Sequence, residues 1–293
     1  LFAFAIQPTP LAEQNPIRRK LADLLIARPL QERLGLRRCR VAVSGAAPIA
    51  PELIKWFRST GVPLLEGYGM TESAGVSHVN PPDGARVGSV GVALSTFETK
   101  IAGDGEILVR GPSVFAGYLH NEEATQETID ADGWLHTGDV GQEDDDGYLR
   151  ITGRKKEIII TAGGKNLSPE KIENALKTSP YIKEVVSVGD ARKFISALIQ
   201  IDADAVGDWA GRRELAFTDF ADLSRQPGVL SLIDNEIRQA NQLLAQVEQV
   251  RVFRLFDKEL HQDDGEMTAT QKIRRRAVME IWASLIDDMY GGT

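Results

Sequence analysis

A short segment at residues 67–72 combines an aromatic ring, a hydroxyl, a carboxylate and two glycines. Tyr68 offers a flat face and a polar tip that suit a purine, and the glycines on either side allow close approach of the backbone. Thr71 can donate a hydrogen bond to a phosphate oxygen, and Glu72 can ligate a hard cation such as magnesium. This combination predicts a site for a nucleoside phosphate, with Gly69 at its turn.

The elements expected around this segment favour the same site. Residues 40–44 read as a buried strand, residues 51–60 as a helix, and residues 62–65 as a second strand that runs into a tight turn. Ligands in such units bind beyond the carboxyl ends of the strands, where the loops lie. The loop at residues 45–48, which follows the first strand, is therefore expected at the same edge of the sheet.

Composition narrows the class of protein. The chain has 293 residues, of which 42% are hydrophobic and 26% are charged, so it is predicted to be globular with two domains. It lacks an apolar run of membrane-spanning length, and its single cysteine, Cys39, fits a reducing compartment, so a cytoplasmic location is expected. The net charge of -8 argues against a general nucleic-acid binder. The scattered histidines offer no zinc-like spacing.

Four further motifs follow along the chain. They are GWLHTGD at 133–139, GYLRITGRKKE at 147–157, GGKN at 163–166 and GEMTATQK at 265–272. With YGMTE at residues 68–72, this order resembles the adenylate-forming (AMP-binding) superfamily, which includes acyl-CoA synthetases, luciferases and the adenylation domains of peptide synthetases. The last three motifs look most like those of long-chain fatty acyl-CoA synthetases, and the resemblance covers nearly the whole chain.

This resemblance implies an ATP and magnesium site. Tyr68 would pack on or beside adenine, Asp139 would accept hydrogen bonds from the ribose hydroxyls, and Arg154 would reach ribose or phosphate with its planar guanidinium. Thr71 would bind phosphate and Glu72 would hold Mg2+. A dinucleotide-binding loop is excluded, because Glu72 stands where its third glycine is needed. The resemblance also implies that the nucleotide-binding residues include Gly45, Ala46, Pro48 and Gly69.

The resemblance also implies two half-reactions. In the first, a fatty acid carboxylate attacks ATP to form an acyl adenylate, with Lys272 bridging the carboxylate and the α-phosphate. In the second, a small domain rotates about a hinge at Lys156, and CoA takes the acyl group as a thioester. Gly163 and Gly164 would let the pantetheine arm of CoA pass close to the backbone, although a plain hairpin turn also explains this pair.

The expected fold class is α/β plus α+β. Residues 1–155 form the C-terminal part of a large AMP-binding domain, with a remnant of an α/β subdomain at 1–88 and a small antiparallel β-barrel at 89–153. Residues 156–293 form a mobile C-terminal α+β domain. The phosphate loop of the superfamily, which ends in Pro-Lys-Gly, has no counterpart before residue 40, so we interpret the chain as the later part of a longer enzyme that is inactive alone.

Two apolar segments have alternative interpretations. The predicted helix at 229–247 carries an apolar stripe that favours core packing over a fatty-acid groove. The basic amphipathic segment at 17–34 favours a buried helix over contact with a membrane surface. The stripe consists of Val229, Leu232, Ile233, Ile237, Ala240, Leu243 and Leu244.

Three functions stay open at this point. The favoured one is ligation of a long-chain fatty acid to CoA, with fatty acid, ATP and CoA as partners. A second is an acyl-AMP ligase that delivers to a carrier protein, but the uninterrupted junction at residues 153–156 favours CoA. The third is a non-catalytic nucleotide-binding or interaction module, which the missing phosphate loop suggests. Peripheral membrane contact, a homodimer and the acyl chain length also stay open.

Overall fold

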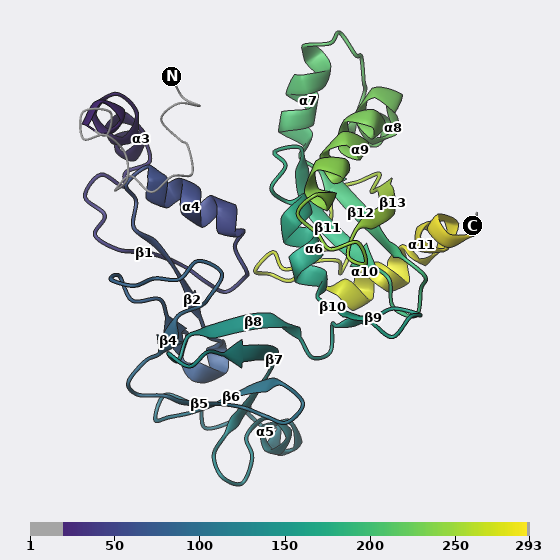
Figure 1. Ribbon diagram of the computed structural model, residues 1–293. Coiled ribbons are helices and arrows are strands. Elements are labelled where there is room, and N and C mark those ends of the chain that lie inside the picture. Colours follow the sequence, from purple (N-terminus) through teal and green to yellow (C-terminus); the bar gives the residue numbers. More distant parts are fainter. Residues whose placement is uncertain (1–19, 292–293) are drawn as a thin grey trace. The chain divides into compact units, whose positions relative to one another are not determined.

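The computed structural model describes residues 20–291. The chain divides into two compact units, Leu1–Lys156 and Glu157–Thr293 (Figure 1). Among the described residues, none of the helices combines the length and the apolar character that a bilayer-spanning segment needs.

The first sheet of the first unit begins with a parallel pair of strands. Strand β1 (Ala42–Ser44) is followed by helix α4 (Pro51–Ser59) and strand β2 (Leu64–Tyr68), and Ser44 pairs with Glu66. Pro51 suits the first turn of α4, because the amide hydrogen that proline lacks would have no partner within the helix there. The predicted order of strand, helix and strand is therefore present. Two short antiparallel strands, β3 (His78–Val79) and β4 (Val92–Ala93), complete the sheet.

Strand β2 continues further than the sequence predicted. We expected the strand to end at residue 65 and Tyr68 to lie in a turn, but Gly67 pairs with Val79 and Tyr68 pairs with His78 of β3. This pairing keeps the backbone extended, and every residue of β2 is buried. Tyr68 is therefore anchored in a sheet rather than carried on a loop.

A second sheet of four antiparallel strands occupies the region where a barrel was predicted. Its strands run in the order β5 (Glu98–Ile101), β6 (Glu106–Arg110), β7 (Leu135–Glu143) and β8 (Leu149–Arg154). Ile107, Leu135 and Leu149 lie completely buried in the core on this sheet. Helix α5 (Glu122–Thr128) connects β6 to β7, and Asn121 caps it by accepting a hydrogen bond from the amide of Ala124 at 3.1 Å.

The acidic run at residues 144–146 forms the hairpin tip between β7 and β8. Arg86 bridges two of its carboxylates, at 2.6 Å from Asp144 and 2.5 Å from Asp146, and its guanidinium lies over the ring of Tyr148. One cation therefore offsets the repulsion between two neighbouring anions at this turn.

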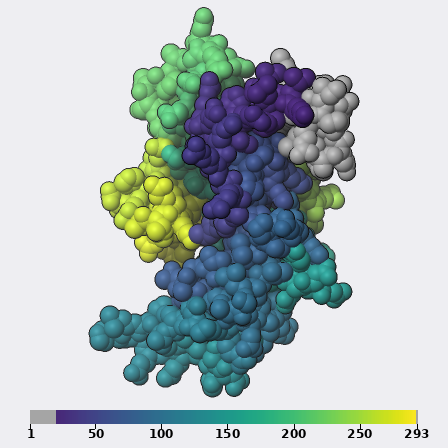
Figure 2. Space-filling model, turned by 90° about the vertical axis from the view of Figure 1, so that its left-hand side faces the viewer, coloured from purple at the N-terminus to yellow at the C-terminus, as the bar shows by residue number. Residues whose placement is uncertain are grey.

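The described part of the segment at 17–34 is not a buried helix, contrary to the expectation. It forms a short π-helix, η2 (Asp23–Ala27), followed by α3 (Arg28–Arg33), and neither contains a buried residue. Leu21, Leu24 and Leu25 are 52%, 56% and 59% exposed. The segment lies within the purple part of the surface in Figure 2. Leucine side chains that are this exposed gain little free energy from burial. Residues 17–19 of the prediction lie outside the described residues.

The second unit contains a sheet of three strands with helices packed on it. The strand order is β11 (Ile182–Val188), β12 (Ile195–Ile201) and β13 (Val250–Leu255), with the first pair antiparallel and the second parallel. All seven residues of β12 are buried, including the polar Ser196 and Gln200. The helices are α6 (Pro169–Leu176), α7 (Ala203–Gly211), α8 (Phe220–Arg225), α9 (Pro227–Asn241), α10 (Arg275–Ile281) and α11 (Ala283–Tyr290).

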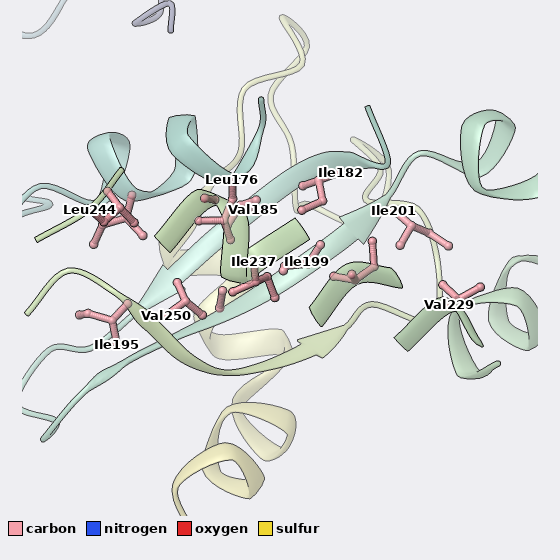
Figure 3. Close-up of a cluster of buried hydrophobic side chains, with 14 of the residues drawn as sticks. Leu176, Ile182, Val185, Ile195, Ile199, Ile201, Val229, Ile237, Leu244 and Val250 are labelled. Atoms are coloured by element: carbon pink, nitrogen blue, oxygen red, sulfur yellow. The ribbon is translucent and has the colours of Figure 1, made fainter. Parts of the chain in front are cut away.

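The main core of this unit lies between its sheet and helices α6 and α9. Figure 3 shows Leu176, Ile199 and Ile237, from α6, β12 and α9, among the side chains gathered there. Most of the predicted apolar stripe contributes to this core, so the prediction of core packing is confirmed. The stripe residues in the core are Val229, Ile233, Ile237, Ala240 and Leu244.

One helix prediction in this unit was too long. Helix α9 ends at Asn241 rather than at residue 247, because the side chain of Asn241 binds the backbone amide and carbonyl of Val250 at 2.9 Å each. Leu243 consequently lies 60% exposed, outside the core that we predicted for it. Helices α10 and α11 follow one another in the sequence and are separated at Trp282.

Candidate functional site

The first predicted nucleotide loop lies against strand β2. A β-carbon added to Gly45 would lie 3.0 Å from the carbonyl oxygen of Gly67, so the loop after β1 passes close to the neighbouring strand. Ala46, the next residue, has a left-handed backbone with φ of 68°. Because β1 and β2 are parallel, this loop and the segment that follows Tyr68 lie at the same edge of the sheet. Pro48 belongs to the same loop.

Three of the predicted nucleotide-binding residues meet at one carboxylate. The phenol of Tyr68 donates to one oxygen of Asp139 at 2.6 Å, and Nε of Arg154 lies 3.3 Å from the other oxygen. Asp139 and Arg154 are direct cross-strand partners on β7 and β8. Asp139 is only 6% exposed, whereas the side chain of Arg154 is 55% exposed. The structure therefore joins two sheets of the first unit at Asp139.

The environment of Tyr68 keeps its phenol protonated. Burial raises the pKa of Tyr68, and the nearby charge of Asp139 raises that pKa further, well above its usual range. The phenol is thus a stable hydrogen-bond donor, and it fixes the orientation of the carboxylate. A carboxylate held at both oxygens is suited to accept hydrogen bonds from a pair of adjacent hydroxyls.

Thr71 and Glu72 lie on a single turn of 3-10 helix, η3 (Thr71–Ser73). Thr71 is exposed and Glu72 is partly buried. The backbone carbonyl of Glu72 accepts a hydrogen bond from the amide of Phe115 at 2.8 Å. One carboxylate oxygen of Glu72 accepts a hydrogen bond from the phenol of Tyr118 at 2.7 Å. Phe115 and Tyr118, more than forty residues away in the sequence, thus hold the backbone and the side chain of Glu72.

The oxygen ligands available at Glu72 and Thr71 fit one way of binding magnesium. Among the described residues, no group of three or more His, Cys, Asp and Glu side chains could hold a metal ion. Mg2+ is usually bound through only one or two carboxylates together with substrate phosphates, and it keeps several waters. A single carboxylate beside the hydroxyl of Thr71 fits that mode, and it does not fit a metal site made from protein ligands alone.

Lys272 lies in the second unit, at the end of a tight loop. The amide of Thr268 donates to the carbonyl of Lys272 at 2.8 Å, and the amide of Lys272 donates to the hydroxyl of Thr268 at 3.0 Å. The loop begins at the completely buried Glu266, whose carboxylate accepts hydrogen bonds from Lys258 at 3.0 Å and Trp282 at 2.9 Å. The backbone of this loop is therefore anchored, while the side chain of Lys272 is exposed.

The glycine pair lies in the turn of a small hairpin. Strands β9 (Ile159–Ile160) and β10 (Asn166–Leu167) pair antiparallel, and the amide of Gly164 donates to the carbonyl of Thr161 at 2.8 Å. Gly164 has φ of 72°, and a β-carbon there would meet no atom within 4 Å. Gly164 thus leaves open space above the turn, and the nearest atom to a β-carbon at Gly163 would be the hydroxyl of Thr161 at 3.9 Å.

The predicted site residues are divided between the two units. Lys156 is the last residue of the first unit. Those of the first unit are Gly45, Ala46, Pro48, Tyr68, Gly69, Thr71, Glu72, Asp139, Arg154 and Lys156. Those of the second unit are Gly163, Gly164 and Lys272.

Sequence reasoning did not single out two residues of this region, Glu66 and Tyr118. Glu66 lies in β2 and is only 9% exposed, and a charged residue inside an apolar strand was the signal that could have drawn attention to it. Burial raises the pKa of Glu66 to about 7. Tyr118 carried no comparable signal, because its role depends on a contact with a distant segment.

Two buried side chains of the first sheet, His78 and Glu66, are expected to change the free energy of unfolding with pH in opposite directions. Burial lowers the pKa of His78 from 6.5 to about 4, so the imidazole is neutral between the hydroxyls of Ser77 and Thr99, each 3.0 Å away. Its contribution to stability is present above pH 6.5 and is lost as the pH falls toward about 4. Glu66 has a raised pKa, so its contribution is present below pH 4.5 and is lost as the pH rises toward about 7.

Substitutions should separate these two contributions. In Glu66→Gln only His78 remains, so the free energy of unfolding should fall by about 1.4 kcal/mol per pH unit, relative to the unsubstituted chain, from pH 6.5 to pH 4.5. In His78→Gln only Glu66 remains, and the free energy should rise over the same interval. Urea denaturation at both pH values measures the change. Equal pH dependence in all three proteins would contradict the expected burial of these groups.

Family models match both parts of the chain. The model described as AMP-binding enzyme matches residues 13–119, and the model described as AMP-binding enzyme C-terminal domain matches residues 156–293.

Two relatives of similar sequence are ligases. A long-chain-fatty-acid–CoA ligase of Mycobacterium bovis, FadD15, is 43% identical over 92% of this chain and 44% of its own length. A long-chain-fatty-acid–CoA ligase of Xenopus laevis, ACSBG2, is 33% identical over 94% of this chain and 40% of its own length. The chain therefore spans less than half the length of these relatives.

Solved structures show the same fold. The adenylation domain of a carboxylate reductase from Mycobacterium chelonae has a TM-score of 0.72 at 22% identity, covering 99% of this chain and 45% of that chain. The o-succinylbenzoate CoA synthetase of Bacillus subtilis, in complex with its acyl-adenylate intermediate, has a TM-score of 0.61 at 25% identity, covering 81% of this chain and 45% of that chain. These neighbours share a mixed α/β architecture with a curled antiparallel sheet. By its two matching family models and its similarity to these ligases, the chain belongs to the AMP-binding, adenylate-forming enzyme family.

Proposed function

We propose that this chain supplies the later part of an enzyme that activates a long-chain fatty acid with ATP and transfers it to CoA. The observation that carries the proposal is the meeting of Tyr68 and Arg154 at the carboxylate of Asp139. The similarity to long-chain-fatty-acid–CoA ligases supports the substrate class. We use the term parent enzyme for a protein of the relatives' length that contains this chain.

In the proposed site, the first unit binds the nucleotide. Asp139, oriented by Tyr68, would accept hydrogen bonds from the ribose hydroxyls, and Arg154 would lie beside them. Adenine would lie against the loop after β1, near Tyr68. Thr71 would donate to a phosphate oxygen, and Glu72 would hold Mg2+. The bound metal would supply charge neutralisation on the phosphates, which is the main requirement of such a displacement.

The second unit would supply the cation for acyl-adenylate formation and the path for CoA. Lys272 would bridge the fatty acid carboxylate and the α-phosphate, where negative charge gathers in the transition state. For thioester formation, we propose that the second unit is mobile and turns about Lys156, since this residue lies at the boundary between the units. The open turn at Gly163 and Gly164 would then admit the pantetheine arm.

An acyl-AMP ligase that delivers to a carrier protein is the second candidate. Both candidate functions include the first half-reaction, so the nucleotide-binding residues do not distinguish a CoA ligase from an acyl-AMP ligase. The junction from β8 to β9 runs from Arg154 to Ile159 without an inserted element, which favours CoA as the acceptor. Membrane contact, a homodimer and a cytoplasmic location stay predictions from the sequence.

The proposed function predicts ATP–pyrophosphate exchange by the parent enzyme that depends on a long-chain fatty acid. Added CoA should yield the acyl-CoA, which mass spectrometry identifies. The isolated 293-residue chain should not catalyse exchange, because no phosphate loop was recognised in its sequence.

Each assay has an outcome that counts against a specific proposal. Acyl adenylate without acyl-CoA would favour transfer to a carrier protein. A parent enzyme that binds nucleotide without any exchange would favour the non-catalytic module. Exchange by the isolated chain would refute our view that the chain is only part of the catalytic site.

A further inference from the structure

Glu106, at the start of β6, is a buried carboxylate that contacts three potential donors. It is only 6% exposed. Its Oε1 accepts a hydrogen bond from the amide of Gly138 at 3.0 Å, and its Oε2 accepts one from Nζ of Lys155 at 3.0 Å. Nδ1 of His136 lies 3.2 Å from the same Oε2. Burial by itself raises the pKa of Glu106, but these hydrogen bonds outweigh it and keep that pKa below its usual range. Glu106 is therefore held ionised.

One of these contacts positions the turn that carries Asp139. Gly138 has φ of 71°, a left-handed conformation that favours glycine. Besides the bond from Gly138 to Glu106, the hydroxyl of Thr137 donates to the carbonyl of Ile107 at 2.7 Å and accepts from the amide of Asp139 at 3.1 Å. The backbone immediately before and at Asp139 is thus fixed to strand β6 at two points.

A second contact positions the residue that follows Arg154. The amide of Lys155 donates to the carbonyl of Gly138 at 2.8 Å, and its Nζ lies 2.5 Å from Asp104 and 3.0 Å from Glu106. Both the backbone and the side chain of Lys155 are therefore bound to the first unit. The first unit ends one residue later, at Lys156.

We propose that Glu106 is a positioning residue with two linked roles. It sets Asp139 and Arg154 for the ribose, through Gly138 and Lys155, and it fixes the first-unit end of the connection between the two units. Rotation of the second unit would then begin after Lys155. The ribose role rests on the proposed function, whereas the anchoring of Gly138 and Lys155 does not.

A purely structural ion pair is the competing explanation. Buried ion pairs often contribute little net stability, because the cost of removing the charges from water offsets their attraction. A structural pair would affect unfolding, but it would not change nucleotide affinity in a protein that remains folded. Readouts other than stability therefore decide between the two explanations.

The test compares Glu106→Gln with a matched control, Glu98→Gln. Glu98 lies on the neighbouring strand β5 and pairs with Arg110 at 2.6 Å, but its side chain is 65% exposed. In this chain, hydrogen exchange should become faster at the amides of Gly138 and Lys155 in Glu106→Gln only. In the parent enzyme, the KM for ATP in pyrophosphate exchange should rise roughly tenfold in Glu106→Gln, with a smaller change in kcat. Lys155→Gln, at an exposed side chain, should raise the same KM if Glu106→Gln fails to fold.

Hydrogen exchange in this chain and the KM for ATP in the parent enzyme give separable outcomes. If Glu106→Gln, or Lys155→Gln in its place, matches Glu98→Gln in both amide exchange and KM, the proposal is overturned. If the amides exchange faster but the KM for ATP is unchanged, the ribose role is overturned and the anchoring role is supported. If the unsubstituted parent enzyme shows no ATP–pyrophosphate exchange, the proposed function fails and the ribose role fails with it. Faster amide exchange would still support the anchor in that case.

Discussion

Replacing Lys272 with alanine is expected to slow ATP–pyrophosphate exchange by the parent enzyme roughly 100- to 1000-fold, which corresponds to a loss of ~3 to 4 kcal/mol of transition-state stabilisation. The flexible side chain places a compact ammonium charge where two anions must approach each other. The hydrogen bonds between Thr268 and the backbone of Lys272 do not involve that side chain, so the loop should keep its shape in the variant.

The measurement must separate the two half-reactions. Thioester formation from premade acyl adenylate should be nearly unaffected by Lys272→Ala, because the α-phosphate has already reacted. Lys177→Ala is a matched control, since Lys177 is a surface lysine of the same unit that pairs with Glu184 at 2.7 Å. Equal losses in exchange and thioester formation would show that Lys272 has no specific role in adenylation.

Gly69→Ala is expected to have the second largest effect. An added β-carbon would lie 2.1 Å from the carbonyl oxygen of Gly75 and 2.8 Å from the α-carbon of Val76. These are backbone atoms, and the loop that contains them is closed by the amide of Gly75, which donates to the carbonyl of Met70 at 3.0 Å. The variant must therefore shift the turn that carries Thr71. Overpacking of this kind typically costs about 1 to 3 kcal/mol of stability.

Misplacement of Thr71 and Glu72 should lower exchange by the parent enzyme roughly 100-fold, since a displacement of about 1 Å can have that effect. Urea denaturation of the chain measures the stability change. Gly103→Ala is the control, because a β-carbon at Gly103 meets no atom within 4 Å and the position has no left-handed backbone. If both alanine variants retain the activity and stability of the unsubstituted protein, the tight approach at Gly69 does not matter for the site.

Local sequence signals correctly predicted the order of strand, helix and strand at the start of the first sheet. A proline at the start of α4 and an apolar strand on each side determine the order of strand, helix and strand. The prediction that Asp139 and Arg154 serve one site agrees with their cross-strand pairing.

Several features that sequence reasoning missed depend on partners outside the element concerned. Strand β2 extends to Tyr68 because β3 pairs with it, and α9 stops at Asn241 because Val250 satisfies its side chain. Glu106 acquires its role only when Gly138 and Lys155 reach it from other strands. Neither hydrophobic periodicity nor a short motif contains that information.

The opposite shifts of Glu66 and His78 have a consequence for the protons themselves. Between pH 4.5 and pH 6.5 the native sheet holds its proton on the carboxyl of Glu66 and leaves the imidazole of His78 neutral. The unfolded chain holds that proton on the imidazole and leaves the carboxyl ionised. With respect to this pair, unfolding near the middle of this interval moves the proton from the carboxyl to the imidazole, and the net uptake of protons from the buffer is close to zero.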